Sequence, residues 1–197
     1  MSHDKIMFQE PLISHGHEFL KFVIDNQVLR FGKFTLKSGR VSPYFFDTGL
    51  FNTGKLLAAL ARFYAAILHE AEPDDFMLFG PAYKGIPLAT ATATALSEYH
   101  GRDVPFAFNR KERKDHGEGG HLVGSKLNGR IVIIDDVITA GTSVKEAVQI
   151  IEATGAEPVS LAIALDREEK INGDGHSAAQ IIREQLGIQI YAIAKFS

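Results

Sequence analysis

The chain contains the stretch Ile131-Val132-Ile133-Ile134-Asp135-Asp136-Val137-Ile138-Thr139-Ala140-Gly141-Thr142-Ser143, in which an apolar run leads into two acids and then into small and hydroxyl residues. Four consecutive β-branched residues, bounded by polar positions, are typical of a strand that is buried on both faces. The pattern from about Ser143 to Thr154 is helical and stops before Gly155. This order of strand, acidic turn and helix predicts one unit of a parallel α/β sheet.

Strands and helices alternate along much of the remaining chain. The sequence predicts helices over Ser14–Gln27, Thr53–Glu70, Ile86–Tyr99 and Ser177–Leu186, and strands over Phe76–Phe79, Val104–Phe108, Val159–Leu165 and Ile188–Ala194. Short aromatic segments, Phe34–Lys37 and Tyr44–Phe46, predict extended pieces around a turn. We therefore expect an α/β fold, with about five mostly parallel strands flanked by helices and a smaller N-terminal hood over about residues 1–50.

Length and composition narrow the class of protein. A chain of 197 residues, 45% hydrophobic and 23% charged, predicts a single globular domain over residues 1–197. The absence of cysteine excludes disulfides, zinc thiolates and a cysteine nucleophile. A net charge of −3 argues against nucleic-acid binding. Without an apolar run of about 20 residues or a secretory signal, we expect no membrane association and a cytoplasmic location.

The segment 109–126 interrupts the alternation of strands and helices. It carries Arg110, Lys111, Arg113 and Lys114, followed by glycines and few apolar residues. A long connection without secondary structure is usually a lid, a binding loop or a disordered segment. We expect a mobile lid here, and the alternative is a solvated charged loop.

The turn after Ile134 has the composition of an anion site. Small and hydroxyl residues from Thr139 to Ser143 let backbone N–H groups converge at the start of a helix, where phosphate binds favourably. Two carboxylates beside a phosphate would repel it unless a cation or sugar hydroxyls intervene. The expected ligand is therefore a phosphorylated ribose with Mg²⁺, and the alternative is a solvated acidic turn before a helix cap.

The stretch Asp135–Ser143 resembles the phosphoribosyl-diphosphate binding motif of the type I phosphoribosyltransferases. Within that family the chain is similar to the orotate enzymes, through Phe34–Arg40, Ser42–Phe46, Gly80–Pro87, Asn109–Glu112, Lys114–Gly120 and Asp166–Arg167. These matches follow one another in order from about residue 30 to about residue 170.

The resemblance implies a pentosyltransferase of pyrimidine biosynthesis. Such an enzyme transfers phosphoribosyl from 5-phospho-α-D-ribose 1-diphosphate to orotate, which gives orotidine 5′-monophosphate and diphosphate. It uses Mg²⁺, held mainly by the diphosphate and the ribose hydroxyls, with water-mediated contact to Asp135 or Asp136. It also implies a homodimer, because in this family the lid commonly reaches the site of the neighbouring subunit.

The same resemblance implies roles for particular residues. Asp135 and Asp136 would contact the ribose hydroxyls or hydrated Mg²⁺, and Tyr83 and Lys84 would contact diphosphate from a turn that often holds a non-proline cis peptide. The residues around the 5′-phosphate would be Val137, Ile138, Thr139, Ala140, Gly141, Thr142 and Ser143.

Two further groups follow from the resemblance, one for the base and one for the lid. The base pocket would be formed by Lys37, Phe45, Phe46 and Arg167. The lid would clamp the diphosphate through Arg110, Lys111, Lys114 and His116. Of these, Lys114 and His116 join Asp135 and Asp136 as the expected catalytic residues, with Lys114 stabilising or protonating the leaving group.

Three other functions stay open at this point. They are a phosphoribosyltransferase for another base, a non-catalytic sensor of phosphoribosyl diphosphate, and a receiver-like phosphoacceptor domain. Gly49–Lys55 resembles a P-loop, but Leu56 stands where a Ser or Thr would bind Mg²⁺, so a capped helix start is the better interpretation. His15 and His17 have no third converging ligand, which argues against a metal site.

Overall fold

The computed structural model describes residues 12–35, 41–114, 120–138, 141–168 and 176–195. The helices are α1 (Leu12–Asp25), η1 (Thr48–Leu50, a 3₁₀ helix), α2 (Gly54–Ala71), α3 (Gly85–His100), α4 (Thr142–Glu152) and α5 (Ala178–Leu186). The strands are β1 (Leu29–Thr35), β2 (Val41–Phe46), β3 (Met77–Gly80), β4 (Phe106–Lys114), β5 (Gly120–Gly124), β6 (Arg130–Ile134), β7 (Glu157–Asp166) and β8 (Gln189–Lys195).

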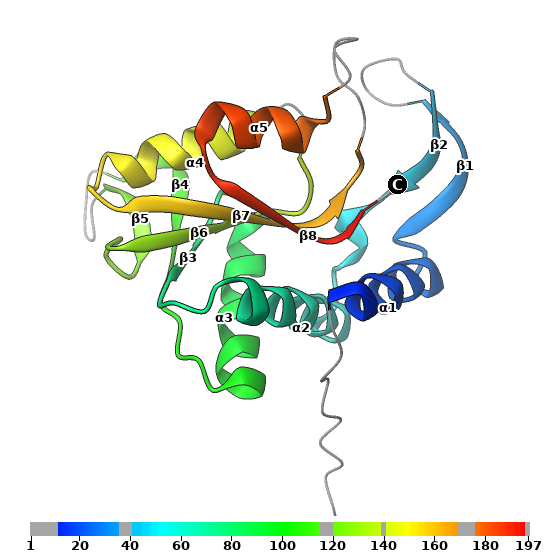
Figure 1. Ribbon diagram of the computed structural model, residues 1–197, viewed down its shortest axis with the longest axis horizontal. Coiled ribbons are helices and arrows are strands. Elements are labelled where there is room, and N and C mark those ends of the chain that lie inside the picture. Colours follow the sequence, from blue (N-terminus) through cyan, green and yellow to red (C-terminus); the bar gives the residue numbers. More distant parts are fainter. Residues whose placement is uncertain (1–11, 36–40, 115–119, 139–140, 169–175, 196–197) are drawn as a thin grey trace, which may run out of the picture.

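A six-stranded sheet forms the centre of the molecule, in the order β5-β4-β3-β6-β7-β8 (Figure 1). Its strands pair in parallel except for β4 and β5, which are antiparallel. The predicted α/β fold with a mostly parallel sheet is therefore confirmed. The sheet has one strand more than the expected five or so, because β5 forms within the segment that was expected to be a loop.

Helices cover both faces of this sheet, with α1, α2 and α3 on one face and α4 and α5 on the other (Figure 1). Alternate residues of each central strand point to opposite faces. In β6, Val132 and Ile134 pack with the first helix group, whereas Ile131 and Ile133 pack with the second. Burial on both faces is the reason that this strand has a continuous apolar sequence.

The hood is the antiparallel pair β1 and β2, in which Leu29 lies opposite Phe46. The side chains of Leu29, Tyr44 and Phe46 are buried in the same cluster as residues of α1, α2 and the main sheet. The hood and the main sheet therefore share one hydrophobic cluster.

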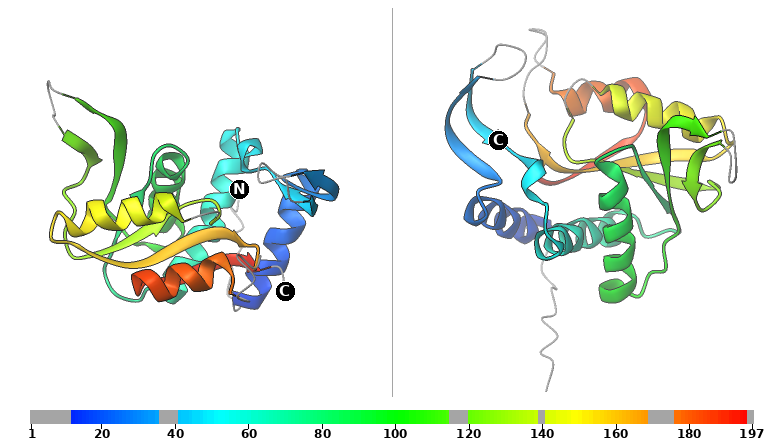
Figure 2. Two further views of the ribbon diagram at one scale, coloured as in Figure 1. Left: turned by 90° about the horizontal axis from the view of Figure 1, so that it is seen from above. Right: turned by 180° about the vertical axis from the view of Figure 1, so that it is seen from behind.

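The described parts of the segment 109–126, residues 109–114 and 120–126, contain more secondary structure than the sequence suggests. Strand β4 continues to Lys114 and pairs with β5, with Phe108 opposite Val123 and Asn109 opposite Leu122. This hairpin projects from the rest of the molecule (Figure 2, left). The expectation that this connection has no secondary structure is wrong at both of its ends. Hydrogen bonds between β4 and β5 satisfy the backbone there, although the sequence lacks the alternation of apolar and polar residues that marks a half-buried strand.

Helix ends agree closely with the sequence signals. Thr53 caps α2, where its hydroxyl accepts a hydrogen bond from the Leu56 N–H at 3.3 Å, so the P-loop-like stretch is a capped helix start. Ser177 and Gln180 form a capping box at α5, and Gly187 ends that helix with a φ of 67°. No helix within the described ranges is long and apolar enough to cross a membrane.

We predict that Gly80→Ala destabilises the fold. A Cβ on Gly80 would lie 2.5 Å from the carbonyl carbon of Gly85, so β3 and the start of α3 would have to separate. Overpacking of this kind costs about 1–3 kcal/mol of the free energy of unfolding, which urea denaturation measures. The matched control is Gly54→Ala, where the added methyl meets nothing within 4 Å. Equal stability of the two variants would contradict the prediction.

Candidate active site

The order of the strands reverses between β3 and β6. From β3 the chain proceeds outward through β4 and β5 on one side, and it then returns to β6 on the other side before continuing to β7 and β8. In open α/β sheets, ligands bind in the crevice that such a reversal leaves at the carboxyl ends of the strands. Tyr83 and Lys84 follow β3, and Asp135 and Asp136 follow β6, so all four lie at this crevice.

Backbone hydrogen bonds to β7 fix the position of the two acids. The Asp135 N–H donates to the Ala162 carbonyl at 3.0 Å, and the Ala164 N–H donates to the Asp136 carbonyl at 2.9 Å. The side chain of Asp136 is only 11% exposed. A carboxylate this buried needs partners, because an unpaired charge away from water is costly.

Lys84 and Thr48 supply the partners of Asp136. The Lys84 ammonium lies 2.6 Å from Oδ2 of Asp136, and the Thr48 hydroxyl donates to the same oxygen at 2.5 Å. Lys84 also donates to the Thr48 hydroxyl at 2.7 Å, so the three polar atoms form a closed triangle. Oδ1 of Asp136 accepts from the Val137 N–H at 2.8 Å.

Burial, and then the neighbouring charge of Asp136, raise the pKa of Asp135 to about 7. Its Oδ1 accepts a hydrogen bond from the Asp136 N–H at 2.9 Å. Tyr64 is fully buried beneath the acids and donates to the Asp135 carbonyl at 2.8 Å. Burial raises the pKa of Tyr64 well above its usual value, so this hydroxyl keeps its proton and its role as a donor.

The turn from β3 to α3 carries Tyr83 and Lys84 at the crevice. The Ala82–Tyr83 peptide is cis, as the family resemblance implied. Oδ1 of Asn109, on β4, accepts a hydrogen bond from the Ala82 N–H at 2.9 Å. The Tyr83 side chain is 70% exposed, and the Lys84 side chain is 63% exposed. Both side chains are therefore open to a ligand.

The start of α4 forms the next wall of the site. Gly141 has a φ of 73° and precedes Thr142 and Ser143, which are exposed at the first turn of the helix. The N–H groups of a first helical turn have no partner within the helix, and they favour anions. Ile138 is buried, so a contact with a ligand would come from its backbone. Thr139 and Ala140 lie outside the described residues.

The residues expected in the base pocket have different surroundings. Phe46 is buried in the core, 6.5 Å from Phe19 between ring centroids, whereas Phe45 points to the other face of β2 and lies 5.7 Å from Phe34. The Arg167 guanidinium lies 5.6 Å from the Tyr44 ring. Lys37 lies outside the described residues.

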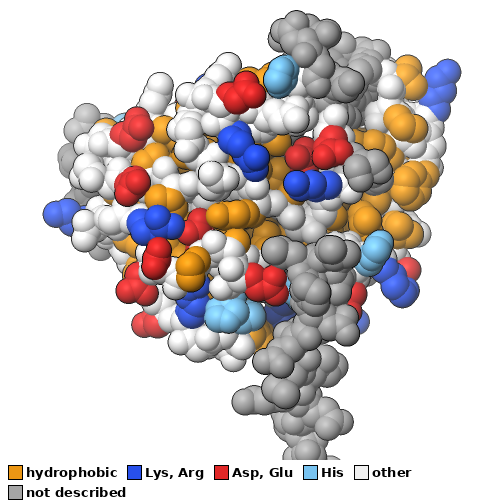
Figure 3. Space-filling view, viewed as in Figure 1, with side chains coloured by type: hydrophobic (Ala, Val, Ile, Leu, Met, Phe, Trp, Pro, Cys, Tyr) orange, Lys and Arg blue, Asp and Glu red, His pale blue; other side chains and the backbone are white. Residues whose placement is uncertain are grey.

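Hydrophobic side chains gather over β1 and β2, at the right of Figure 3. Two hydrophobic residues of these strands, Phe31 and Val41, are 64% and 51% exposed. Arg30 lies 5.6 Å above the Phe45 ring, which adds a cation beside this aromatic residue that the sequence did not suggest.

The lid residues are described only in part. Lys111 lies 3.8 Å from the Glu146 carboxylate of α4, which places this part of the β4–β5 hairpin beside the anion-favouring helix start. Arg110 is also on β4 and is partly exposed. Lys114 ends β4 but its side chain is not described, and His116 lies outside the described residues.

Sequence reasoning assigned no role at the site to Thr48, Tyr64 or Asn109, although Asn109 begins one of the stretches that carry the family resemblance. Thr48 is 88 residues from Asp136, and Asn109 is 27 residues from Ala82. Asn109 stands at the end of the predicted strand Val104–Phe108, a position that could have marked it. Nothing in the local sequence marks Thr48 or Tyr64, because their partners come from other parts of the fold.

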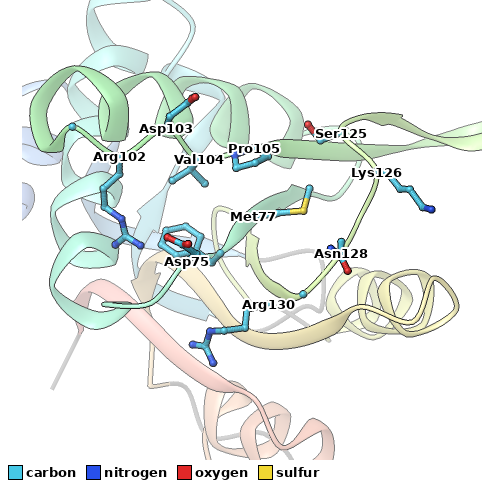
Figure 4. A pocket seen from close by; sticks show the side chains of 13 residues that line it. Asp75, Met77, Arg102, Asp103, Val104, Pro105, Ser125, Lys126, Asn128 and Arg130 are labelled. Carbon is cyan, nitrogen blue, oxygen red and sulfur yellow. The ribbon is translucent and has the colours of Figure 1, made fainter.

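A cavity of about 720 Å³ opens at the opposite end of the sheet, where Met77 begins β3 and Arg130 begins β6 (Figure 4). Its arginines have structural partners: Arg130 pairs with Glu72 at 2.5 Å, and Arg102 donates to the Glu72 carbonyl at 2.6 Å. Since the carboxylates and Lys84 lie at the carboxyl ends of the strands, this cavity is not part of the candidate site. Across the described ranges, no cluster of three or more His, Asp or Glu residues is arranged to hold a metal ion.

Comparisons with known proteins agree with this geometry. The family model for the phosphoribosyl transferase domain matches residues 49–193. The chain is 62% identical to an orotate phosphoribosyltransferase of Thioalkalivibrio sulfidiphilus, over 92% of this chain and 84% of that protein. It is 58% identical to one of Shewanella oneidensis, over 93% and 85%. The crystal structure of a Francisella tularensis orotate phosphoribosyltransferase matches with a TM-score of 0.82, 42% identity, and coverage of 90% and 85%.

The fold, the acidic doublet and the family match together define a type I phosphoribosyltransferase, and the chain belongs to that family. Within the family it belongs with the orotate phosphoribosyltransferases, which it matches at high identity over most of its length.

We predict that Asp135→Asn stabilises the protein more at pH 8 than at pH 5. The folded state holds a proton on Asp135 up to a pKa of about 7, whereas the unfolded chain releases it near pH 4. The contribution of Asp135 to the free energy of unfolding therefore falls as the pH rises from about 4 to about 7, and it is lowest above pH 7. The asparagine removes that cost while its Oδ1 can still accept from the Asp136 N–H.

Urea denaturation of both proteins at the two pH values measures the difference. We expect the gain of the variant in unfolding free energy to be larger at pH 8 by at least about 1 kcal/mol, since one pKa unit corresponds to about 1.4 kcal/mol. Glu98→Gln, which removes an exposed carboxylate on α3, is the control for loss of charge. A gain that is the same at both pH values would show that Asp135 is not protonated in the folded state.

Proposed function

We propose that this chain transfers phosphoribosyl from 5-phospho-α-D-ribose 1-diphosphate to orotate, with release of orotidine 5′-monophosphate and diphosphate. The observation that carries the proposal is the meeting of Lys84 and Asp136 at 2.6 Å in the crevice between β3 and β6, beside the start of α4. A cation, two carboxylates and a helix N-terminus suit the diphosphate, the ribose hydroxyls and the 5′-phosphate of one donor molecule. The names of the relatives supply the identity of the base.

The reaction needs positioning and charge neutralisation rather than a protein nucleophile. The ring nitrogen of orotate forms a bond to carbon 1 of the ribose as the bond from that carbon to diphosphate breaks, and the proton of that nitrogen passes to the departing diphosphate or to water. Lys84 can neutralise the departing diphosphate, and the carboxylate of Asp136 can accept hydrogen bonds from the ribose hydroxyls. Asp135, with a pKa of about 7, is partly protonated near neutral pH, which reduces its repulsion of the anionic donor.

The residues present fit a Mg²⁺ ion that is held mainly by the substrate. Mg²⁺ commonly uses one or two carboxylates together with substrate phosphates and water, and Asp135 and Asp136 are the carboxylates at the crevice. When bound, Mg²⁺ would neutralise charge on the diphosphate. Because Oδ2 of Asp136 is already occupied by Lys84 and Thr48, Asp135 is the more accessible of the two toward a hydrated ion.

The base pocket is proposed to lie at the hood, beside the end of β7. Orotate is a flat ring with a carboxylate, so an aromatic wall and a cation suit it. Phe45 and Arg167 are the described candidates, together with Lys37 from the segment that is not described. Phe46 would support the pocket from the core rather than contact the base, because its ring packs against Phe19 and Phe51.

The lid residues Arg110, Lys111, Lys114 and His116 are proposed to close over the diphosphate, in the site of a second subunit of a homodimer. The projection of the β4–β5 hairpin from the molecule supports this (Figure 2). Closure would keep water from the cationic sugar. The cytoplasmic location expected from the sequence stays a prediction.

The decisive experiment is a spectrophotometric assay of the purified chain. We expect the orotate absorbance to fall when phosphoribosyl diphosphate and Mg²⁺ are added, and to be unchanged when a chelator removes the metal. Uracil, hypoxanthine and adenine are the comparison bases, and we expect them to give at most about one hundredth of the rate, since they lack the carboxylate that the cations would bind. Equal rates with another base would overturn the assignment of orotate.

We predict that Lys114→Ala lowers the turnover number by at least about a hundredfold, with a smaller effect on the KM of either substrate. A lid cation that stabilises the leaving group acts mainly in the transition state, so its loss appears in kcat. The matched control is Lys126→Ala, which removes an exposed lysine near the cavity at the other end of the sheet. An unchanged turnover number would remove Lys114 from the mechanism.

Lys114→Ala also tests the proposal that the lid acts in the site of the second subunit of a homodimer. Mixed dimers of Lys114→Ala with Asp136→Asn contain one site in which both residues are intact, if Lys114 acts in the site of the partner. Mixing the two inactive proteins should then restore up to about one quarter of the wild-type activity. No recovery after subunit exchange, confirmed by mass spectrometry, would place Lys114 in the site of its own subunit.

A further inference from the structure

The hydroxyl of Thr48 lies between the cation and the carboxylate of the site. It donates to Oδ2 of Asp136 at 2.5 Å and accepts from the Lys84 ammonium at 2.7 Å. Thr48 belongs to η1, 36 residues before Lys84 and 88 before Asp136. Neither the family resemblance nor the sequence pattern assigned it a role.

Local structure does not require this hydroxyl. The cap of η1 is Asp47, whose Oδ1 accepts from the Gly49 N–H at 3.2 Å, and the turn closes through backbone bonds from Leu50 and Phe51. The Thr48 hydroxyl takes part in neither the cap nor the turn. It contacts two charged groups instead, Asp136 after β6 and Lys84 at the start of α3. The hydroxyl therefore serves the site rather than the fold.

Substrate binding requires the pair of Lys84 and Asp136 to change partners. Under the proposed function, Lys84 moves to the diphosphate and Asp136 turns its oxygens to the ribose. Asp136 is nearly buried, so the departure of Lys84 would remove the charged partner of Oδ2 before the ribose hydroxyl arrives. Thr48 donates to that oxygen independently of Lys84.

We propose that Thr48 is a positioning residue that holds Oδ2 of Asp136 while Lys84 transfers from Asp136 to the diphosphate of the donor. The inference rests on the proposed function, since it assigns that donor to the crevice. It predicts that Thr48 determines the affinity for phosphoribosyl diphosphate and has little influence on orotate, because the two groups that its hydroxyl touches, Lys84 and Asp136, are assigned to the diphosphate and the ribose of the donor.

The test compares Thr48→Val, which keeps the shape of the side chain but removes the hydroxyl, with Thr48→Ser, which keeps the hydroxyl. For Thr48→Val we expect the KM for phosphoribosyl diphosphate to rise about tenfold, as for the loss of one hydrogen bond to a charged group. The KM for orotate should stay within about twofold, and Thr48→Ser should restore wild-type values. Thr94→Val, on the exposed face of α3, is the matched control.

Titration calorimetry with phosphoribosyl diphosphate and Mg²⁺ measures the same loss of affinity without turnover. Wild-type affinity in Thr48→Val overturns the inference. So does an equal loss in Thr48→Ser, or a parallel rise of both KM values, because either would show a packing role. A wild-type protein that binds the donor but converts no orotate contradicts the proposed function, and the calorimetric comparison still decides the role of Thr48.

Discussion

The burial of two adjacent carboxylates at the end of β6 is the constraint on which the site depends. Asp136 is nearly out of water and remains there because Lys84 and Thr48 both contact one of its oxygens. Asp135 meets the same constraint by retaining its proton to a pKa of about 7. Burial thus keeps Asp135 partly protonated near neutral pH, and this reduces the repulsion that the acidic doublet exerts on an anionic substrate.

The reversal of strand order between β3 and β6 makes this arrangement possible. Lys84 and Asp136 are 52 residues apart, and they meet because β3 and β6 are parallel neighbours that end at the same edge. The close approach of Gly80 and Gly85 directs the chain from β3 into α3, and so places Lys84 at the crevice. The cavity at the amino ends of these strands has no such convergence, and its arginines bind backbone and Glu72 instead.

Much of the fold was predictable because its elements carry strong local signals. The buried strand Ile131–Ile134 and the capped ends of α2 and α5 follow directly from apolar runs and hydroxyl caps. Strand β5 was missed, because an edge strand paired on a projecting hairpin shows little hydrophobic alternation. Phe45 and Phe46 were predicted to share one role, but alternation along β2 sends one to the outer face and the other into the core.

By itself, the sequence determined the class of fold, the acidic doublet and the anion-favouring helix start. These depend on runs of neighbouring residues whose chemistry is local. Only the tertiary structure decided which groups surround the doublet and the adjacent turn. Lys84 and Thr48 contact the Asp136 carboxylate, Tyr64 donates to the Asp135 backbone carbonyl, and Asn109 accepts from the Ala82 N–H. The physical reason is that hydrogen bonds and ion pairs act over about 3 Å in space, a distance that bears no relation to separation along the chain.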